Sequence, residues 1–399
     1  MKDLKNPFSL YVFLWATYLL QGLLYKEGSL LSQLLFLLIA FVSIKHFIFL
    51  LNAQHKPALL TGLSVMLALF TIYGVVFFLT YGLTVKIYYE ELSSINYLKS
   101  YFLSILPVFT GYYYAKRGIV DLELMKKIVP FFVIIGVLVF YREEMENMSL
   151  LLEKGIYEET ITNNAGYFIL GILPCSLVYY KKPLFQYLIV IICVVFVLMS
   201  MKRGAIFITS LILFYMFFAE FLRGSFKIKT AILIGGAIVI CFLLYYISHY
   251  LIQNEYFMLR IEETLEGNSS GRDELYSTLA NHIMNEMTLF GYLVGEGAMA
   301  TLKIMGKYAH NDWLEIFTCH GLLGVSLFIY YWHSFLLSSR NKKLDTTSRM
   351  VLMSYFIIYL SMTFFSMSIG DMIVFAGLMI GFALANGFEN NTKRIVSKI

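Results

Sequence analysis

Apolar segments of about twenty residues recur along almost the whole chain, and this recurrence restricts the fold more than any other feature. A helix needs about 20 mostly apolar residues to cross the hydrocarbon core of a membrane. Only 14% of the residues are charged, whereas a soluble domain averages about 25%. The sequence therefore predicts an all-α polytopic membrane protein that forms a single membrane domain over residues 1–399.

We expect about twelve membrane-spanning helices. The first follows directly after the short segment 1–7, which indicates a transmembrane helix rather than a cleaved signal peptide. The fifth segment is short, and only Lys202 and Arg203 separate the seventh from the eighth. The expected spans are 8–25, 29–51, 58–81, 95–115, 128–141, 163–180, 184–201, 204–222, 230–252, 312–337, 350–367 and 369–387.

The distribution of Lys and Arg predicts the orientation of the chain. Cytoplasmic loops of membrane proteins carry an excess of these residues. If the N-terminus is cytoplasmic, the cytoplasmic segments hold nearly twice as many Lys and Arg residues as the outer segments. We therefore expect both termini in the cytoplasm and the long loop 253–311 outside. The net charge of +5 needs no nucleic-acid partner, because loop cations of this kind set the orientation.

The outer loop 253–311 is expected to be partly helical. Residues 270–273 have the spacing of a capping box, and the run 275–287 has the amphipathic spacing of a helix on the membrane surface. The Gly-x-Gly of 295–297 then predicts a tight turn. Arg272 is placed to meet an anion at the helix N-terminus, although a solvated surface position suits it equally well.

A second cationic feature is the hinge Met201-Lys202-Arg203-Gly204 between two apolar spans. A charge at the bilayer centre costs on the order of 3 kcal/mol, but this pair can reach the outer interface, so snorkelling is one interpretation. The other is that Lys202 and Arg203 hold a pyrophosphate at the membrane surface, with Gly204 permitting a tight turn. Lys99, near the outer end of the fourth span, is a further candidate for that role.

His310 lies in Ala309-His310-Asn311-Asp312-Trp313, at the entrance of the tenth span. The unperturbed pKa of histidine, about 6.5, allows it to accept a proton near neutral pH. Asn311 suits either a sugar hydroxyl or the start of the helix, and Trp313 suits the interface or stacking on a sugar ring. We therefore take His310 as the candidate catalytic residue.

These motifs resemble those of a known family. His310-Asn311, nine residues, Gly321, two residues and Gly324 is similar to the His-Asn/Ser/Gln, nine, Gly, two, Gly pattern of the bacterial O-antigen polymerase and ligase superfamily. The Ser-Gly-Arg of 270–272, the Gly-x-Gly of 295–297 and Lys202-Arg203-Gly204 resemble further motifs of that family in order and sidedness. The motifs cover a minor part of the chain, and its first half is generic.

The resemblance implies a glycosyltransferase of the bacterial inner membrane, with a fold like that of the C-class glycosyltransferases and with its active site facing the periplasm. It would transfer a glycan from undecaprenyl diphosphate without a metal or other cofactor, most simply with inversion. The expected partners are the lipid-linked oligosaccharide, membrane lipids and a chain-length regulator protein. The implied roles are His310 as general base, Arg203, Arg272, Lys202 and Lys99 in diphosphate binding, Asn311 and Trp313 in positioning the acceptor, and Gly321 and Gly324 as motif glycines.

Three alternatives stay open. A polymerase adds the glycan to another lipid-linked repeat unit, and we favour it over a ligase, which adds the glycan to lipid A-core. A secondary transporter is the alternative of another class, but transporters place ionisable residues at the midplane, whereas those of this chain cluster at the outer face. A metal site at the paired carboxylates Glu90 and Glu91 is the least favoured alternative.

Overall fold

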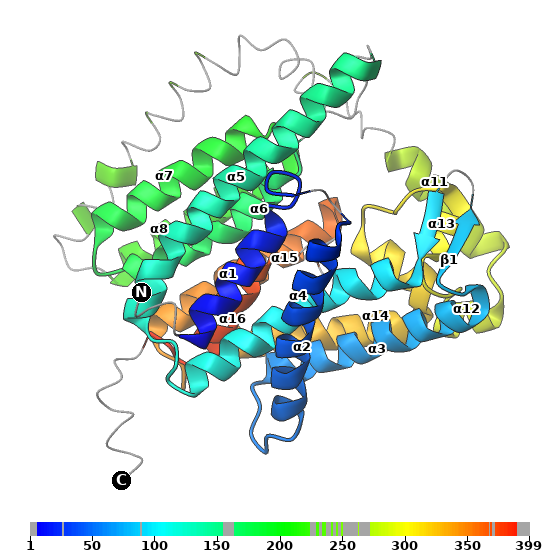
Figure 1. Cartoon of the computed structure of the whole chain (residues 1–399), viewed down its shortest axis with the longest axis horizontal. Helices are drawn as coiled ribbons and strands as arrows, with labels where there is room; N and C mark the ends of the chain where they lie inside the picture. The colour runs from blue at the N-terminus through cyan, green and yellow to red at the C-terminus, as the bar shows by residue number, and fades with distance from the viewer. Residues whose placement is uncertain are drawn as a thin grey trace.

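A computed structural model describes residues 6–25, 28–87, 90–154, 163–223, 272–366, 368 and 372–388, with single positions or short pieces between 229 and 262. Their regular secondary structure is helical apart from one hairpin (Figure 1). The helices of the first half are α1 (Pro7–Leu19), α2 (Leu30–Leu51), α3 (Ala58–Tyr81), α4 (Ser94–Lys116), α5 (Leu122–Lys154), α6 (Ala165–Ile172), η2 (Leu173–Tyr179), α7 (Pro183–Met199) and α8 (Arg203–Arg223). Those of the second half are α11 (Arg272–Asn285), α12 (Leu289–Val294), α13 (Ala300–Met305), α14 (Asp312–Ser339), α15 (Thr346–Phe365) and α16 (Val374–Leu384).

Helix α2 exposes a continuous apolar stripe. Its exposed side chains recur at alternating steps of four and three residues, and Leu30 and Phe41 are 73% and 70% exposed. Soluble proteins rarely expose apolar surface of this extent, and 22 residues at 1.5 Å per residue correspond to about 33 Å, close to the thickness of a hydrocarbon core. Four further described helices are also long and apolar enough to cross a membrane, so the protein is a multi-pass membrane protein. The stripe consists of Leu30, Leu34, Leu37, Phe41, Ile44, Ile48 and Leu51.

The expected count of twelve spans is wrong. Among the described residues, five helices are long and apolar enough to cross a membrane: Leu30–Leu51, Ala58–Tyr81, Leu122–Glu146, Arg203–Leu222 and Asp312–Ser339. The apolar helices Pro7–Leu19, Ala165–Tyr179, Pro183–Met199 and Val374–Leu384 are shorter.

The shortfall has local causes. The expected helix 8–25 ends at Leu19, before Gly22 turns the chain with a φ of 90°. The expected helix 163–180 divides into α6 and the tighter η2, which carries Pro174. Helix α4 is long enough, but it is rich in Tyr and Ser and contains Lys99. The expected span 230–252 lies largely outside the described residues.

The all-α prediction also missed one element. Strands β1 (Thr84–Ile87) and β2 (Glu90–Ser93) form an antiparallel hairpin between α3 and α4, with Thr84 opposite Ser93. The segment Thr84-Val85-Lys86-Ile87 alternates polar and apolar residues and is rich in β-branched side chains, which favours a strand. The hairpin lies with α11, α12 and α13 at one end of the molecule, beyond α3 and α14 (Figure 1).

Two close contacts hold the centre of the bundle together. Gly377 and Gly381 of α16 form a Gly-x-x-x-Gly pair that lets α16 lie directly on α4. A Cβ at Gly381 would come within 2.3 Å of the Val108 carbonyl oxygen, and one at Gly111 within 2.4 Å of the Leu378 carbonyl oxygen. Small residues permit this approach between membrane helices.

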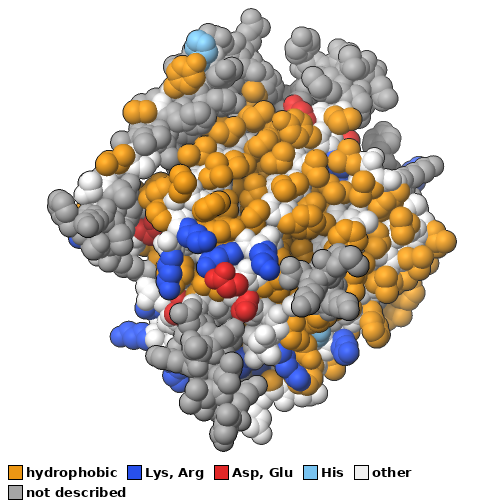
Figure 2. All heavy atoms as spheres, turned by 60° about the vertical axis from the view of Figure 1, so that its left-hand side comes forward, with side chains coloured by type: hydrophobic (Ala, Val, Ile, Leu, Met, Phe, Trp, Pro, Cys, Tyr) orange, Lys and Arg blue, Asp and Glu red, His pale blue; other side chains and the backbone are white. Residues whose placement is uncertain are grey.

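Helices α3 and α14 run antiparallel along each other, with Gly62 of α3 against Ser334 of α14. At the other end of this pair, Tyr73 of α3 lies beside His320 of α14, with ring centroids 4.4 Å apart. The start of α14 therefore lies at one end of this helix pair, and the start of α3 lies at the other end. The other view of the molecule shows a broad apolar surface with a group of Lys and Arg side chains below it (Figure 2).

Candidate functional site

The backbone at His310 is held in an unusual conformation. His310 has a φ of 49°, in the left-handed region that non-glycine residues seldom adopt. Its two neighbours are both anchored: the Ala309 N–H donates to Glu315 Oε2 at 3.0 Å, and Asn311 Oδ1 caps α14 by accepting from the N–H groups of Trp313 and Leu314. Strained residues persist where the surroundings over-determine them, and they cluster at functional sites.

Glu315 is the residue that ties this loop to the protein interior. Its carboxylate is only 5% exposed, and it accepts hydrogen bonds from the Ala309 N–H, from Thr301 Oγ1 at 2.6 Å and from Cys319 Sγ at 3.5 Å. A buried carboxylate is tolerated only with such partners. Glu315 was not among the site residues expected from the sequence. The available signal was a carboxylate one helical turn inside an apolar helix, three residues after Asp312.

The two glycine motifs meet at a kink in α14. Gly321 has a φ of 62° and a ψ of −160°, which interrupts the helix. The carbonyl oxygens of Thr318 and Cys319 accept from the N–H groups of Glu296 (2.9 Å) and Gly297 (3.0 Å), so the Gly-x-Gly turn pairs with the backbone that the kink exposes. A Cβ at Gly321 would lie 2.5 Å from the Gly295 nitrogen. This turn therefore packs on α14.

The His310 side chain is exposed, and cations surround it. Partial desolvation is the largest cause that lowers the pKa of His310, and the charges of Arg272, Lys202 and Lys307 lower it further. The structure thus brings three sequence-predicted residues, His310, Arg272 and Lys202, into one electrostatic neighbourhood. Lys307 is a fourth member, which was not expected from the sequence. The imidazole is consequently neutral to a lower pH than in an isolated histidine.

The hinge before α8 forms as expected, but a different residue makes its turn. Met201 has a φ of 52°, whereas Gly204 lies inside α8, so Gly204 does not provide the tight turn. Lys202 donates from Nζ to Asn164 Oδ1 at 2.5 Å and lies over the Tyr167 ring. Arg203 begins α8 and is half-buried. The hinge is thereby fixed against the start of α6.

Asn311 and Trp313 have structural contacts. Of the two roles expected for Asn311, the structure shows the helix cap. Trp313 donates from Nε1 to Thr363 Oγ1 at 3.0 Å, and this bond joins α14 to α15. The Trp313 ring also packs edge-on against Phe328 of its own helix. Asp312 is buried and accepts from the Ser368 N–H at 2.8 Å. These contacts fix the direction in which α14 leaves the His310 loop.

Other predicted site residues lie elsewhere or outside the described residues. The Lys99 ammonium lies 5.5 Å from the ring centroid of Tyr18 and 5.4 Å from that of Phe36, and it is not among the charges that act on His310. The side chains of Glu90 and Glu91 and the capping residue Ser270 lie outside the described residues. Gly324 lies one turn after His320, and a Cβ there would meet the His320 Cβ at 2.3 Å.

A small cavity of about 100 Å³ lies behind the His310 loop. Tyr97, Tyr101 and Ser100 of α4 line one side, and Tyr308, Glu315 and His320 line the other. Tyr97 and His320 share a hydrogen bond of 3.1 Å between the phenol oxygen and Nε2. Pockets for small-molecule ligands begin at about 300 Å³, so this cavity is part of the support of the loop rather than a substrate pocket.

The described site is therefore a strained histidine at the mouth of a membrane helix, with cations from two other segments around it. A neutral imidazole in this position can accept a proton, and the cations can hold an anion beside it. Comparisons of this chain with protein-family models, with curated proteins and with solved structures find no match.

Proposed function

We propose that this protein is a polysaccharide polymerase of the bacterial cytoplasmic membrane. It transfers a glycan from undecaprenyl diphosphate to the non-reducing end of another lipid-linked repeat unit, at the periplasmic face. The observation that supports this most directly is the strained His310, whose lowered pKa comes from partial desolvation and from Arg272, Lys202 and Lys307. A proton acceptor among cations suits a reaction in which a hydroxyl attacks and a diphosphate leaves.

His310 is the general base in this proposal. A neutral imidazole nitrogen takes the proton of the acceptor hydroxyl while the hydroxyl oxygen attacks the anomeric carbon of the donor sugar. The bond from that carbon to the diphosphate oxygen breaks, and its electron pair stays on the diphosphate. Attack opposite the leaving group inverts the anomeric carbon. The imidazolium then returns its proton to water.

The cations stabilise the leaving group. Arg272 and Lys202 already act electrostatically on the site of His310, and Arg203 follows Lys202 at the start of α8. Negative charge grows on the diphosphate as the glycosyl bond breaks, and fixed cations stabilise that change without reorganising. Arginine also matches phosphate oxygens with two parallel N–H donors. Lys99 takes no part in this proposal, because its ammonium lies over Tyr18 and Phe36.

The decisive experiment uses the purified full chain with lipid-linked repeat units as the only substrate. A ladder of lengthened glycans on the lipid supports the polymerase. Product that forms only after lipid A-core is added would identify a ligase instead. Movement of unaltered lipid-linked units across a vesicle membrane, with no longer product, would identify a transporter.

A further inference from the structure

A candidate binding site for a charged group lies at the opposite end of α14 from His310. A cavity of about 480 Å³ opens between the turn from α2 to α3, the end of α4 and the turn after α14. Helix α14 has 28 residues and is kinked at Gly321, and the 18 residues that follow the kink correspond by themselves to about 27 Å. A hydrocarbon core is about 30 Å thick, so this cavity and His310 lie at opposite membrane faces.

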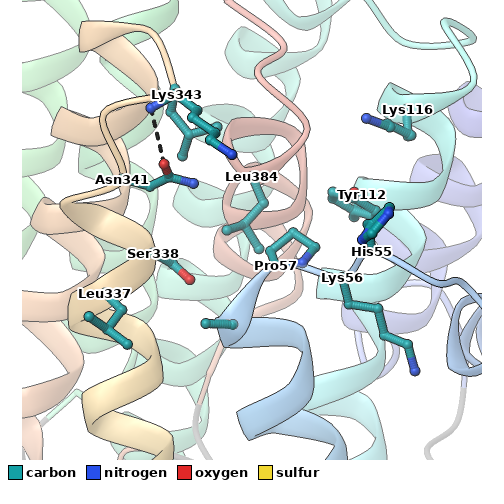
Figure 3. A pocket seen from close by; sticks show the side chains of 12 residues that line it. His55, Lys56, Pro57, Tyr112, Lys116, Leu337, Ser338, Asn341, Lys343 and Leu384 are labelled. Atoms are coloured by element: carbon teal, nitrogen blue, oxygen red, sulfur yellow. Dashed lines mark hydrogen bonds between the residues drawn. The ribbon is translucent and has the colours of Figure 1, made fainter.

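Basic side chains reach the cavity from three segments. Lys116 of α4 and Lys343 of the turn after α14 point into it from opposite sides, and His55 also lines it (Figure 3). Lys56 points away, and its Nζ donates to the Leu51 carbonyl oxygen. None of the described residues that line the cavity is an Asp or Glu. The potential inside is therefore positive, with no lining carboxylate to neutralise it.

The start of α3 and the Asn341 amide also face the cavity. Pro57, which precedes α3, has no side-chain donor or acceptor to cap the helix, and Pro57 and Ala58 both line the cavity. The Leu59 N–H in the first turn of α3 donates to Ser338 Oγ at 3.0 Å, so α3 contributes the positive end of its dipole but no free donor at Leu59. Asn341 Oδ1 accepts from the Lys343 N–H at 3.0 Å, and this leaves the Asn341 amide nitrogen directed toward the cavity (Figure 3).

The rest of the lining is apolar. Leu337, Leu344 and Leu384 lie among the cations, and Leu337 is 51% exposed, so the cavity is continuous with the apolar outer surface of α14. Cations beside exposed leucines suit an amphiphile that has an anionic head and acyl chains. On the charge distribution of the sequence, we expect this end to be cytoplasmic, where anionic lipids are concentrated and where basic pockets bind lipid head groups.

We propose that this cavity binds the phosphate of an anionic lipid head group at the membrane face opposite His310. Lys116 and Lys343 hold the phosphate from two sides, with the Asn341 amide as a further donor. The leucines receive the upper part of the acyl chains. This site is independent of the proposed glycosyl transfer, so failure of the polymerase assay leaves it standing.

Native mass spectrometry of the full chain in detergent tests this proposal, with phosphatidylglycerol as the probe and zwitterionic phosphatidylcholine as the reference. The K116Q/K343Q variant removes two lining cations. Each lysine contributes about fivefold to affinity for an anionic lipid, so the pair is expected to weaken phosphatidylglycerol binding more than tenfold. The matched control K181Q/K342Q removes the same charge from exposed lysines that do not line the cavity.

The expected result is a selective loss. Phosphatidylglycerol binds the parent chain better than phosphatidylcholine does, K116Q/K343Q loses that preference and K181Q/K342Q keeps it, with unchanged thermal unfolding in both. An equal loss in the control variant would overturn the proposal in favour of diffuse surface charge. A parent chain with no preference between the two lipids would also overturn it. If millimolar inorganic phosphate displaces the lipid, the proposal of a lipid ligand is wrong. Lys116 and Lys343 would then form a site for free phosphate.

Discussion

Glu315, in the first turns of α14, accepts a hydrogen bond of 3.0 Å from the backbone N–H of Ala309, and this bond fixes the conformation of the loop that carries His310. The bond closes a short loop of the backbone, and His310 in this loop has a strained φ of 49°. Because Glu315 also accepts from Thr301, the loop is tied to α13 as well as to α14. The conformation of the candidate base therefore depends on a carboxylate that does not itself touch the reacting atoms.

Replacing His310 tests the proposed base. We expect His310→Ala to lower polymer formation by about 10²–10⁴-fold, the usual contribution of a general base, with a normal level of protein in the membrane. His333→Ala is the matched control, because His333 is exposed on the same helix and far from the site. Product gels and immunoblots of membranes give the two readings. Retained polymer in His310→Ala would remove the base from the proposed mechanism.

The pH profile tests the electrostatics around His310. Its pKa is lowered by partial desolvation and by Arg272, Lys202 and Lys307, so the neutral form persists below the ordinary value of about 6.5. As the pH falls through the lowered pKa, the imidazole becomes protonated and kcat/KM falls. Lys307→Gln removes one cation, so we expect the acid limb to move to higher pH. An unchanged limb in Lys307→Gln, or the same movement in the distant control Lys342→Gln, would contradict this assignment.

Glu315 is proposed as a positioning residue. Glu315→Ala leaves the Ala309 N–H and the Thr301 hydroxyl without their acceptor, and each such loss costs about 1–3 kcal/mol. We expect a lower midpoint of thermal unfolding and a lower kcat, with little change in KM. Glu315→Gln keeps a carbonyl oxygen that can accept from Ala309, so it should recover much of both. Equal defects in the two variants would show that the charge, rather than the hydrogen bonds, is what matters.

Gly321 tests whether the kink of α14 is required. Gly321→Ala places a Cβ 2.5 Å from the Gly295 nitrogen and demands a φ of 62° from a residue with a side chain. Gly118→Ala is the control, because Gly118 has a φ of 70° with nothing within 4 Å of the added atom. The control should lose about 1–2 kcal/mol from the backbone alone, and Gly321→Ala clearly more. Similar unfolding curves for the two would show that the turn at Gly295 yields easily.

His282 couples α11 to the Gly-x-Gly turn. Its Nδ1 lies 2.8 Å from Glu286 and its Nε2 lies 2.8 Å from Glu296. Burial, the largest single cause, lowers the pKa of His282, but the hydrogen bonds and charges of Glu296 and Glu286 together outweigh it and raise the pKa. The stabilisation is therefore present below about pH 6.5 and is lost as the pH rises through the folded pKa.

Hydrogen exchange of the α11 amides reports how the protonation of His282 changes the stability of this helix. We expect exchange to become faster, beyond the intrinsic chemical rate, as the pH rises through the folded pKa of His282. Glu296→Gln removes one carboxylate and should move the change to lower pH. Protection of α11 that does not respond to pH would contradict the coupling.

The sequence predicts long spans well where an apolar run is unbroken. The expected 29–51 and 58–81 match α2 and α3 within one residue, because every turn of these segments is apolar. It overestimates the number of spans where apolar residues continue past the end of a helix. Composition does not reveal that α1 stops at Leu19 or that the chain changes to a tighter helix at Leu173. These ends depend on turns and on Pro174, whose ring removes a backbone donor.

For the site, the sequence alone shows which side chains are available: His310, the cations at 202–203 and 272, and glycines at 295, 297 and 321. Their chemistry follows from the side chains alone. The packing of the chain places Lys202 and Arg272 where they lower the pKa of His310, and it places Lys99 over Tyr18 and Phe36. It also makes Met201 rather than Gly204 the turn residue and lets Glu315 fix the loop. The physical reason is that the pKa of a side chain and the strain of a backbone depend on distances between segments far apart in the chain, which a pattern in one segment does not contain.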